Sequence, residues 1–158
     1  MAEPNNLLPR PEAHAFLDDA QRITNEGLVD ELLAIFADDA VAEWIMDGAA
    51  DTHRGIDAIR AAATELFDVC HALGLHVEKT LECEGDDTLV FSWRGGFRGG
   101  TRQFGTEIWT FGNGLVVRHQ MYSYLDVRPS SSPLAGLRLV ASSPKVVAAL
   151  MRYRIKNR

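Results

Sequence analysis

Residues 75–126 read LHVEKTLECEGDDTLVFSWRGGFRGGTRQFGTEIWTFGNGLVVRHQMYSYLD. Apolar and polar side chains alternate through this stretch, and three short glycine-rich or acidic turns interrupt it. Alternation with a period of two is typical of strands whose two faces meet different surroundings. The stretch therefore predicts an antiparallel meander of four strands, over residues 75–83, 88–98, 101–111 and 115–126.

Helical periodicity precedes the meander. Apolar residues recur at spacings of three and four over residues 12–25, 28–36 and 56–73, which predicts three helices. A short strand over residues 41–46 and a polar loop over residues 47–54 separate the second helix from the third. Helices that precede a meander indicate an α+β fold, with the helices packed on a curved, mostly antiparallel sheet.

The two ends of the chain differ from this body. Residues 1–11 contain three prolines and two asparagines, which predicts a mobile arm before the domain at residues 12–127. Residues 128–158 form a basic extension, in which Ser143 and Pro144 are typical of the start of a helix. We expect this extension to dock on the acidic body, with an anionic membrane or a partner protein as alternatives.

Composition and charge limit the functions that this chain can have. The chain has 158 residues, a formal net charge of −6 and 46% apolar residues, as expected for one globular domain with an extension. Its acidic body argues against nucleic acid as a partner. It has neither a leader pattern nor a long apolar run, so we expect a cytoplasmic protein without membrane contact. Cys70 and Cys83 are expected to be buried free thiols.

The order of these elements resembles that of the nuclear transport factor 2-like superfamily. Three stretches carry the resemblance, which covers about residues 12–127: VDELLAIFADDAVAEW at 29–44, HRGIDAIRAA at 53–62 and FGTEIWTFGNGLVVRHQMYSYLD at 104–126. It implies a cone-shaped, cystatin-like fold with a pocket for a small molecule. The nearest branches are the SnoaL-like polyketide cyclases, limonene epoxide hydrolase and ketosteroid isomerase.

The catalytic residues of two branches carry over only in part. Trp44 stands where ketosteroid isomerase has its aspartate base, whereas Glu107 matches the aspartate of its oxyanion hole. Arg94 matches the arginine of limonene epoxide hydrolase, but Gly96 and Ser123 replace the two aspartates of that enzyme. The resemblance therefore implies an isomerase, a cyclase or an epoxide-opening enzyme without fixing the reaction.

Turn lengths predict which side chains of the meander meet. A three-residue turn at 112–114 places Glu107 opposite His119, and a two-residue turn at 99–100 places Glu107 opposite Ser92. These pairings predict that one face of the sheet carries Ser92, Arg94, Gly96, Gly105, Glu107, Trp109, Phe111, Val117, His119, Met121 and Ser123. A bulge at Gly95-Gly96 would instead exchange Arg94 for Trp93 on that face.

Glu107 and His119 are the main catalytic candidates. In an apolar cavity the coupling of a carboxylate to an imidazole shifts both pKa values and can place a general acid or base near neutrality. Arg94 is the third catalytic candidate, because it can polarise a carbonyl group or hold an anion. The substrate-binding candidates are Trp44, Ser92, Trp109, Phe111, Met121, Ser123 and Asp47. The competing interpretation is a satisfied polar network in the core.

Asp47, Asp51 and His53 lie in the loop expected at the pocket mouth. Asp47 is three residues past the isomerase base position and is either a displaced base or a solvated charge. The five histidines share no metal-ligand spacing, and GGFRGG lies inside a hairpin rather than between a strand and a helix. We therefore expect neither a metal nor another cofactor.

The opposite face of the sheet is predicted to be apolar and covered. It carries Phe91, Trp93, Phe97, Ile108, Tyr122 and Tyr124, which predicts a homodimer formed through the convex face.

The leading functional hypothesis is a cofactor-independent acid–base enzyme that acts on an apolar, ring-containing small molecule. The alternative is a non-catalytic ligand-binding or dimerisation domain.

Overall fold

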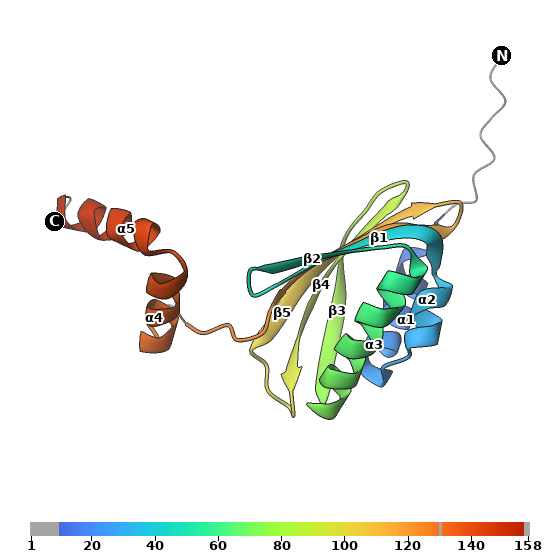
Figure 1. Ribbon diagram of the computed structural model, residues 1–158, viewed down its shortest axis with the longest axis horizontal. Helices are drawn as coiled ribbons and strands as arrows, with labels where there is room; N and C mark the ends of the chain where they lie inside the picture. The colour runs from blue at the N-terminus through green and yellow to red at the C-terminus, as the bar shows by residue number, and fades with distance from the viewer. Residues whose placement is uncertain (1–9, 130, 157–158) are drawn as a thin grey trace, which may run out of the picture. The chain divides into compact units, whose positions relative to one another are not determined.

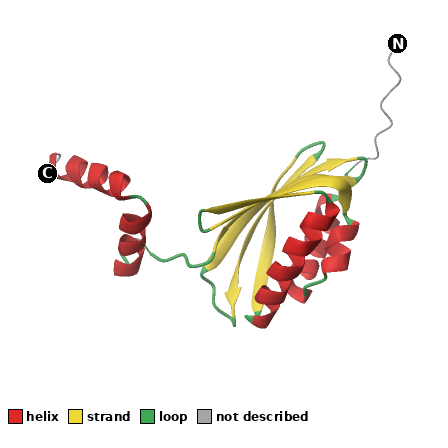
Figure 2. Cartoon of the chain, in the orientation of Figure 1, coloured by secondary structure: helices red, strands yellow, loops and turns green. Residues whose placement is uncertain are grey.

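Three helices lie against one face of a six-stranded sheet (Figures 1 and 2). This computed structural model describes residues 10–129 and 131–156, and most of the predicted arm lies outside them. The helices are α1 (Ala13–Glu26), α2 (Val29–Ala34) and α3 (Ile56–Ala72). The strands are β1 (Phe36–Met46), β2 (Ala49–Arg54), β3 (Leu75–Glu84), β4 (Thr88–Phe97), β5 (Gln103–Gly112) and β6 (Leu115–Tyr124).

The strand order is β2-β1-β6-β5-β4-β3, in which β1 and β6 run parallel and the other neighbours run antiparallel. Helix α1 packs on β3 and α3 packs on β1, so the helices cover the concave face (Figure 1). This arrangement confirms the predicted α+β fold.

Helix α1 begins and ends at residues suited to these positions. The Glu12 carboxylate accepts hydrogen bonds from the backbone N–H groups of His14 and Ala15, and Gly27 ends the helix at φ 69°. Glycine adopts this left-handed conformation without the strain that other residues would incur. One side of the helix is buried against the sheet: Ala13, Phe16, Ala20 and Ile23.

Aromatic packing fills one end of the space between helices and sheet. The Phe16 ring meets the rings of Trp109 and Phe111 edge-on, at centroid distances of 5.2 and 5.1 Å. Edge-to-face contacts of this kind add to the stability that burial provides. The other end of the concave face is the pocket described below.

Residues 47–54 are not the polar loop that the sequence predicted. They form a turn and strand β2, which pairs with β1 so that Met46 faces Ala49. Asp47 and Gly48 make the two-residue turn, at φ 51° and φ 89°. Positive φ at both positions suits the twist of a hairpin, and Asp-Gly is a frequent choice there. The predicted loop was therefore wrong, and β1 begins at Phe36 rather than at residue 41.

The turn between β4 and β5 changes which residues of β4 face the helices. Gly95 pairs with Gln103 and Trp93 with Gly105, so the turn centres on Gly99 instead of lying between residues 99 and 100. A shift of one residue sends every side chain of a strand to the other face. The predicted inward placement of Ser92 and Arg94 was wrong, and Phe91 and Trp93 take the inner positions.

No bulge causes this exchange, because the described β4–β5 pairing runs without a register shift. Ser92 donates a hydrogen bond to Glu82 on the outer face, and Arg94 is exposed there.

The β5–β6 hairpin differs from the prediction in two ways, and together they leave the same residues on the inner face. The turn consists of Asn113 and Gly114 alone, rather than of three residues. A bulge at Val117 then follows the pair of Phe111 with Val116. Glu107 therefore pairs with Met121 rather than with His119. His119 pairs with Trp109, so Glu107 and His119 are diagonal neighbours on the same face. The predicted direct pairing was wrong, and the predicted face was right.

The outer face carries fewer large apolar residues than the sequence predicted. Phe91 and Trp93 belong to the inner face, and Phe97 lines the pocket. The exposed aromatic residues of the outer face are Phe104, Tyr122 and Tyr124. Phe104 stacks on Tyr124 with a centroid distance of 5.1 Å.

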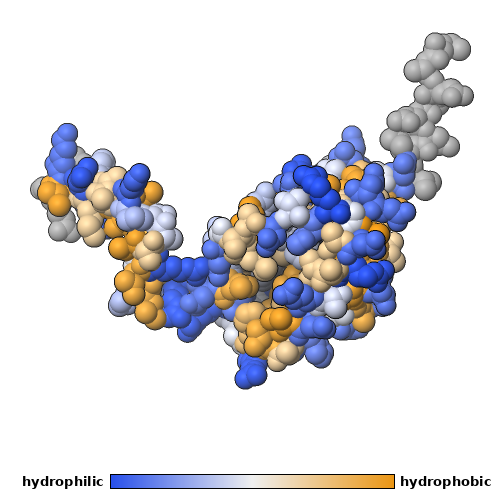
Figure 3. Space-filling view, in the orientation of Figure 1, coloured by the Kyte–Doolittle hydropathy of each residue, from blue (hydrophilic) through white to orange (hydrophobic). Residues whose placement is uncertain are grey.

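The chain divides into two compact units, Met1–Leu125 and Asp126–Arg158. In the second unit, α4 (Pro133–Ser142) forms within a stretch that the sequence analysis left without structure, and α5 (Pro144–Lys156) follows it. Both helices expose apolar and basic side chains (Figure 3). No single described helix has the length and apolarity to cross a membrane, although α4 and α5, bent by 116°, meet that test as a pair.

Candidate active site

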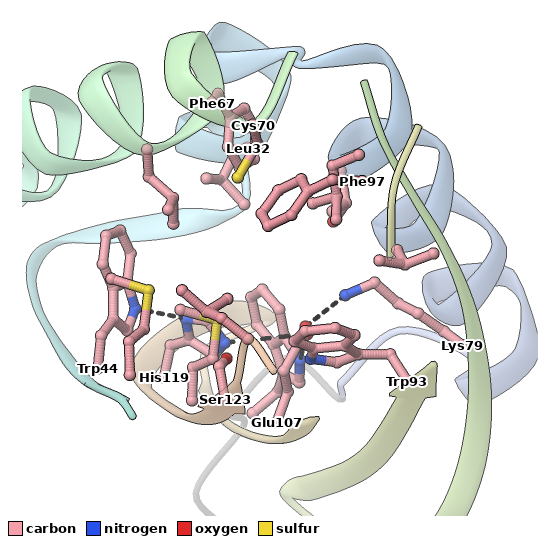
Figure 4. A pocket seen from close by; sticks show the side chains of 18 residues that line it. Leu32, Trp44, Phe67, Cys70, Lys79, Trp93, Phe97, Glu107, His119 and Ser123 are labelled. Carbon is pink, nitrogen blue, oxygen red and sulfur yellow. Dashed lines mark hydrogen bonds and ion pairs between the residues drawn. The ribbon is translucent and has the colours of Figure 1, made fainter. Parts of the chain in front are cut away.

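A pocket lies between the concave face of the sheet and α3 (Figure 4). Leu32, Phe67, Cys70 and Phe97 form the wall across from Trp44, Glu107 and His119. Mostly apolar lining with a few polar groups is typical of small-molecule sites.

Glu107 is the acidic residue of this pocket, and it is 4% exposed. Its Oε1 accepts a hydrogen bond from Lys79 Nζ at 2.5 Å, and its Oε2 accepts one from Trp109 Nε1 at 3.0 Å. Burial opposes ionisation, but the charge of Lys79 and the two hydrogen bonds outweigh it and hold the pKa of Glu107 below its usual range. Glu107 is therefore a carboxylate at neutral pH.

Sequence reasoning missed Lys79. Its side chain is 2% exposed and reaches Glu107 from β3, as Figure 4 shows. The signal was present, because Lys79 stands between Val77 and Leu81 at the apolar positions of an alternating strand. A buried lysine needs an anionic partner, so this position should have been assigned to the pocket with Glu107.

His119 is held as a neutral imidazole. Trp44 Nε1 donates a hydrogen bond to His119 Nδ1 at 3.2 Å, and the ring stacks on Trp109 at 3.9 Å between centroids. Burial outweighs the attraction of Glu107 and lowers the pKa of His119 to about 4. Because Nδ1 accepts a hydrogen bond, the proton lies on Nε2. That Nε2 is buried without a partner, 3.9 Å from Glu107 Oε2.

Strand pairing arranges the inner side chains in rows across β3, β4, β5, β6 and β1. The first row contains Lys79, Trp93, Gly105, Ser123 and Met46. The second contains Leu81, Phe91, Glu107, Met121 and Trp44. Lys79 thus reaches Glu107 from the neighbouring row.

The structure brings most of the sequence-predicted residues together. Trp44, Trp109, Met121 and Ser123 line the pocket beside Glu107 and His119. Phe111 does not line it, because it packs against Phe16 in the core. Ser92 and Arg94 lie on the outer face, so neither reaches a ligand in this pocket.

The residues expected at the pocket mouth have other roles. Asp47 lies in the β1–β2 turn, outside the pocket lining, where its carboxylate accepts a hydrogen bond from the Leu125 backbone at 3.4 Å. His53 meets the Trp44 ring edge-on at 5.0 Å.

Within the described residues, no group of three His, Cys, Asp or Glu could hold a metal ion. Cys70 lines the pocket and is half-buried, whereas Cys83 is exposed and was wrongly expected to be buried.

A curved sheet with helices over its concave face, closed at one end and hollow at the other, defines the cone-shaped class of nuclear transport factor 2-like proteins. The chain belongs to the SnoaL-like domain family, whose model matches residues 15–119. No curated protein matches it significantly.

Solved structures support the fold. A SnoaL-like protein of unknown function from Burkholderia thailandensis is 22% identical, covers 70% of this chain and 93% of its own, and has a TM-score of 0.57. A putative polyketide cyclase from Sinorhizobium meliloti is 20% identical over 68% and 94%, with a TM-score of 0.54. SalBIII, an epoxide hydrolase/cyclase-like enzyme of pyran ring formation in salinomycin, is 17% identical over 70% and 89%, with a TM-score of 0.53.

Proposed function

We propose that this protein is an acid–base enzyme of the cyclase or isomerase type, acting on an apolar, ring-containing small molecule. One observation carries the proposal. An ionised carboxylate, Glu107, and an unpartnered imidazole N–H, on His119, lie 3.9 Å apart in a largely apolar pocket. The similarity to a polyketide cyclase and to an epoxide hydrolase/cyclase-like enzyme supports this class.

The pair suits proton transfer next to a carbonyl group. Glu107 Oε2 removes a proton from the carbon beside the carbonyl, while His119 Nε2–H donates to the carbonyl oxygen as it gains negative charge. A neutral imidazole is suited to this role because its proton stays on the ring while the charge develops. Glu107 then returns the proton to another carbon of a conjugated enolate. Alternatively, the enolate attacks a second carbonyl of the same molecule to close a ring, and the new alkoxide takes the proton from Glu107.

Lys79 acts through Glu107. Its ammonium group holds the carboxylate ionised and fixes its orientation from the side away from His119. The residues that shape the apolar part of the substrate site are Trp44, Trp109 and Met121.

A second candidate is ligand binding without turnover. Both oxygens of Glu107 accept hydrogen bonds, from Lys79 and from Trp109, which is the pattern of a satisfied polar network. In that case the pocket would bind the same class of ligand, and Glu107 would serve the fold.

Glu107→Gln separates the two candidates. The probe is 2-tetralone, an apolar ketone whose acidic α-hydrogens exchange in D₂O, followed by NMR. Binding is measured by quenching of tryptophan fluorescence, since all three tryptophans line the pocket. We expect the wild type to accelerate exchange and E107Q to lose about 10²-fold or more of this rate while still binding.

The matched control is Glu78→Gln, which alters an exposed glutamate on the same sheet and should leave exchange unchanged. Binding without accelerated exchange in the wild type would favour the non-catalytic candidate. Equal exchange by the wild type and E107Q would contradict the role of Glu107.

We also propose that two copies pair through the outer face of the sheet. Support comes from Phe104, Tyr122 and Tyr124, which are 38%, 37% and 50% exposed on neighbouring strands. Large aromatic side chains gathered on one face are typical of an interface.

A further inference from the structure

Three buried polar atoms of the pocket lining have no hydrogen-bond partner among the described residues. They are Trp93 Nε1, His119 Nε2 and Ser123 Oγ. The residues are only 7%, 5% and 4% exposed, and buried polar atoms in native proteins nearly always have a partner. Unpartnered atoms that line a ligand pocket therefore indicate where a ligand supplies the missing partner.

Trp93 and Ser123 lie together, away from His119. Gly105 pairs with Trp93 on one side and with Ser123 on the other, so the three residues form one row across β4, β5 and β6. A Cβ on Gly105 would lie 2.6 Å from Trp93 Nε1, too close for any side chain. The Trp93 indole therefore lies over Gly105, the residue that separates it from Ser123 in the row, and its N–H and the Ser123 hydroxyl group both belong to the pocket lining.

This pair lies one row from Glu107 and two rows from His119. His119 and Ser123 are four residues apart on β6, which is about 13 Å along an extended strand. Because His119 Nε2 lies 3.9 Å from Glu107 Oε2 in the intermediate row, a hydrogen bond of about 2.8 Å at each end leaves at most roughly 7–8 Å between two ligand oxygens. Glu107 and Met121 occupy the row between the two ends.

The chemistry of this end selects a hydrogen-bond acceptor. An indole N–H can only donate, and a serine hydroxyl can donate as well. A carbonyl, ether or phenol oxygen meets these conditions.

We propose that Trp93 Nε1–H and Ser123 Oγ–H form a second subsite, which binds an oxygen at the far end of the ligand. The ligand class is then a fused-ring compound with two oxygens at opposite ends, a carbonyl at His119 and an acceptor oxygen at Ser123. This assignment rests on the proposed function for the His119 end only.

Two matched probes test the subsite. They are 6-methoxy-2-tetralone, which has an acceptor oxygen opposite its carbonyl, and 6-ethyl-2-tetralone, in which CH₂ replaces that oxygen. Affinities of the full-length protein are measured by isothermal titration calorimetry, and the readout is the affinity ratio of methoxy to ethyl probe. This ratio cancels changes of packing that affect both probes alike.

We expect Ser123→Ala and Trp93→Phe each to lower this ratio about fivefold, because one hydrogen bond to the ether oxygen is lost. The control, Thr106→Ala, changes the outer face and should leave the ratio unchanged. An unchanged ratio in both S123A and W93F would overturn the subsite, as would failure of the wild type to bind either probe.

The outcome is independent of catalysis. E107Q tests the proposed reaction by α-hydrogen exchange, whereas the probe ratio tests the subsite by binding alone. A ratio that falls in S123A and W93F supports the subsite even where the wild type catalyses no exchange.

Discussion

At the scale of single residues, the charge of the pocket depends on one buried ion pair. Lys79 and Glu107 neutralise each other, and each would be costly to bury alone. Their pairing also leaves His119 beside a neutral pair rather than beside an isolated carboxylate. This explains why burial, rather than attraction to Glu107, decides the pKa of His119.

Stability should fall in mildly acidic solution because of His119. Its pKa in the folded protein, about 4, is below the ordinary value of 6.5, so the unfolded chain binds more protons between these two values. The free energy of unfolding should therefore decrease as the pH falls from about 6.5 to about 4. Glu107, whose pKa is also lowered, adds to the loss only below its ordinary value of 4.5.

Urea unfolding at a series of pH values measures this dependence. His119→Gln removes the titrating group, so the slope between pH 6.5 and 4.5 should become clearly smaller. The control is His76→Gln, which replaces an exposed histidine and should preserve the slope. An H119Q variant with the full wild-type slope would show that other groups cause the acid sensitivity.

At the scale of elements, two hairpin turns determine which residues form the site. The sequence was sufficient to predict the four strands of the meander and to place Glu107 and His119 on one face. It was not sufficient to predict whether the glycine-rich turns centre on a residue or between two residues. In the β4–β5 hairpin that difference exchanges Arg94 for Trp93, because side chains alternate strictly along a strand.

Other elements show different limits of sequence reasoning. β2 was missed because its side chains are mostly polar and exposed, although Asp47-Gly48 was a recognisable turn. Helix α4 was missed because it contains Gly136 and because Ser and Pro residues flank it. Lys79 was missed because apolar residues were counted as the inner face and a buried charge was not considered.

The β5–β6 turn should be sensitive to substitution at Gly114. This residue has φ 78°, and a side chain in the left-handed region costs roughly 1–2 kcal/mol. Gly114→Ala should lower the free energy of unfolding by about that amount, as measured by urea denaturation. Asn113→Gly is the control, because glycine accepts the φ of 53° and should keep the turn. Equal stability of G114A and the wild type would contradict the assigned turn.

At the scale of the whole molecule, the SnoaL-like domain holds the pocket between its helices and its sheet. Phe16 of α1 packs on the sheet and closes one end of the space between them. At the other end, the paired strands place the polar groups of the pocket in rows. The family and the fold were predictable because they depend on the order of elements. Which polar residues meet in the pocket depends on the pairing register of the strands, and the order of elements does not determine that register.

Pairing of two copies is the prediction that belongs to this scale. Phe104 and Tyr124 stack on each other and, with Tyr122, expose aromatic surface on the outer face. Burying such surface against a second copy stabilises a dimer, since the benefit grows with the apolar area removed from water. Size-exclusion chromatography with light scattering should therefore give twice the chain mass of 17.5 kDa at micromolar concentration.

Tyr124→Glu should shift the protein to a monomer, because a carboxylate would be buried without a partner at the interface. Glu65→Lys is the control, since this exposed residue lies on α3, away from the outer face, and should leave the dimer intact. The monomeric variant should still bind 2-tetralone, because the pocket lies on the opposite face of the sheet. A wild-type protein with the mass of a single chain would refute the pairing. A Y124E variant that remains a dimer would show that the interface does not include Tyr124.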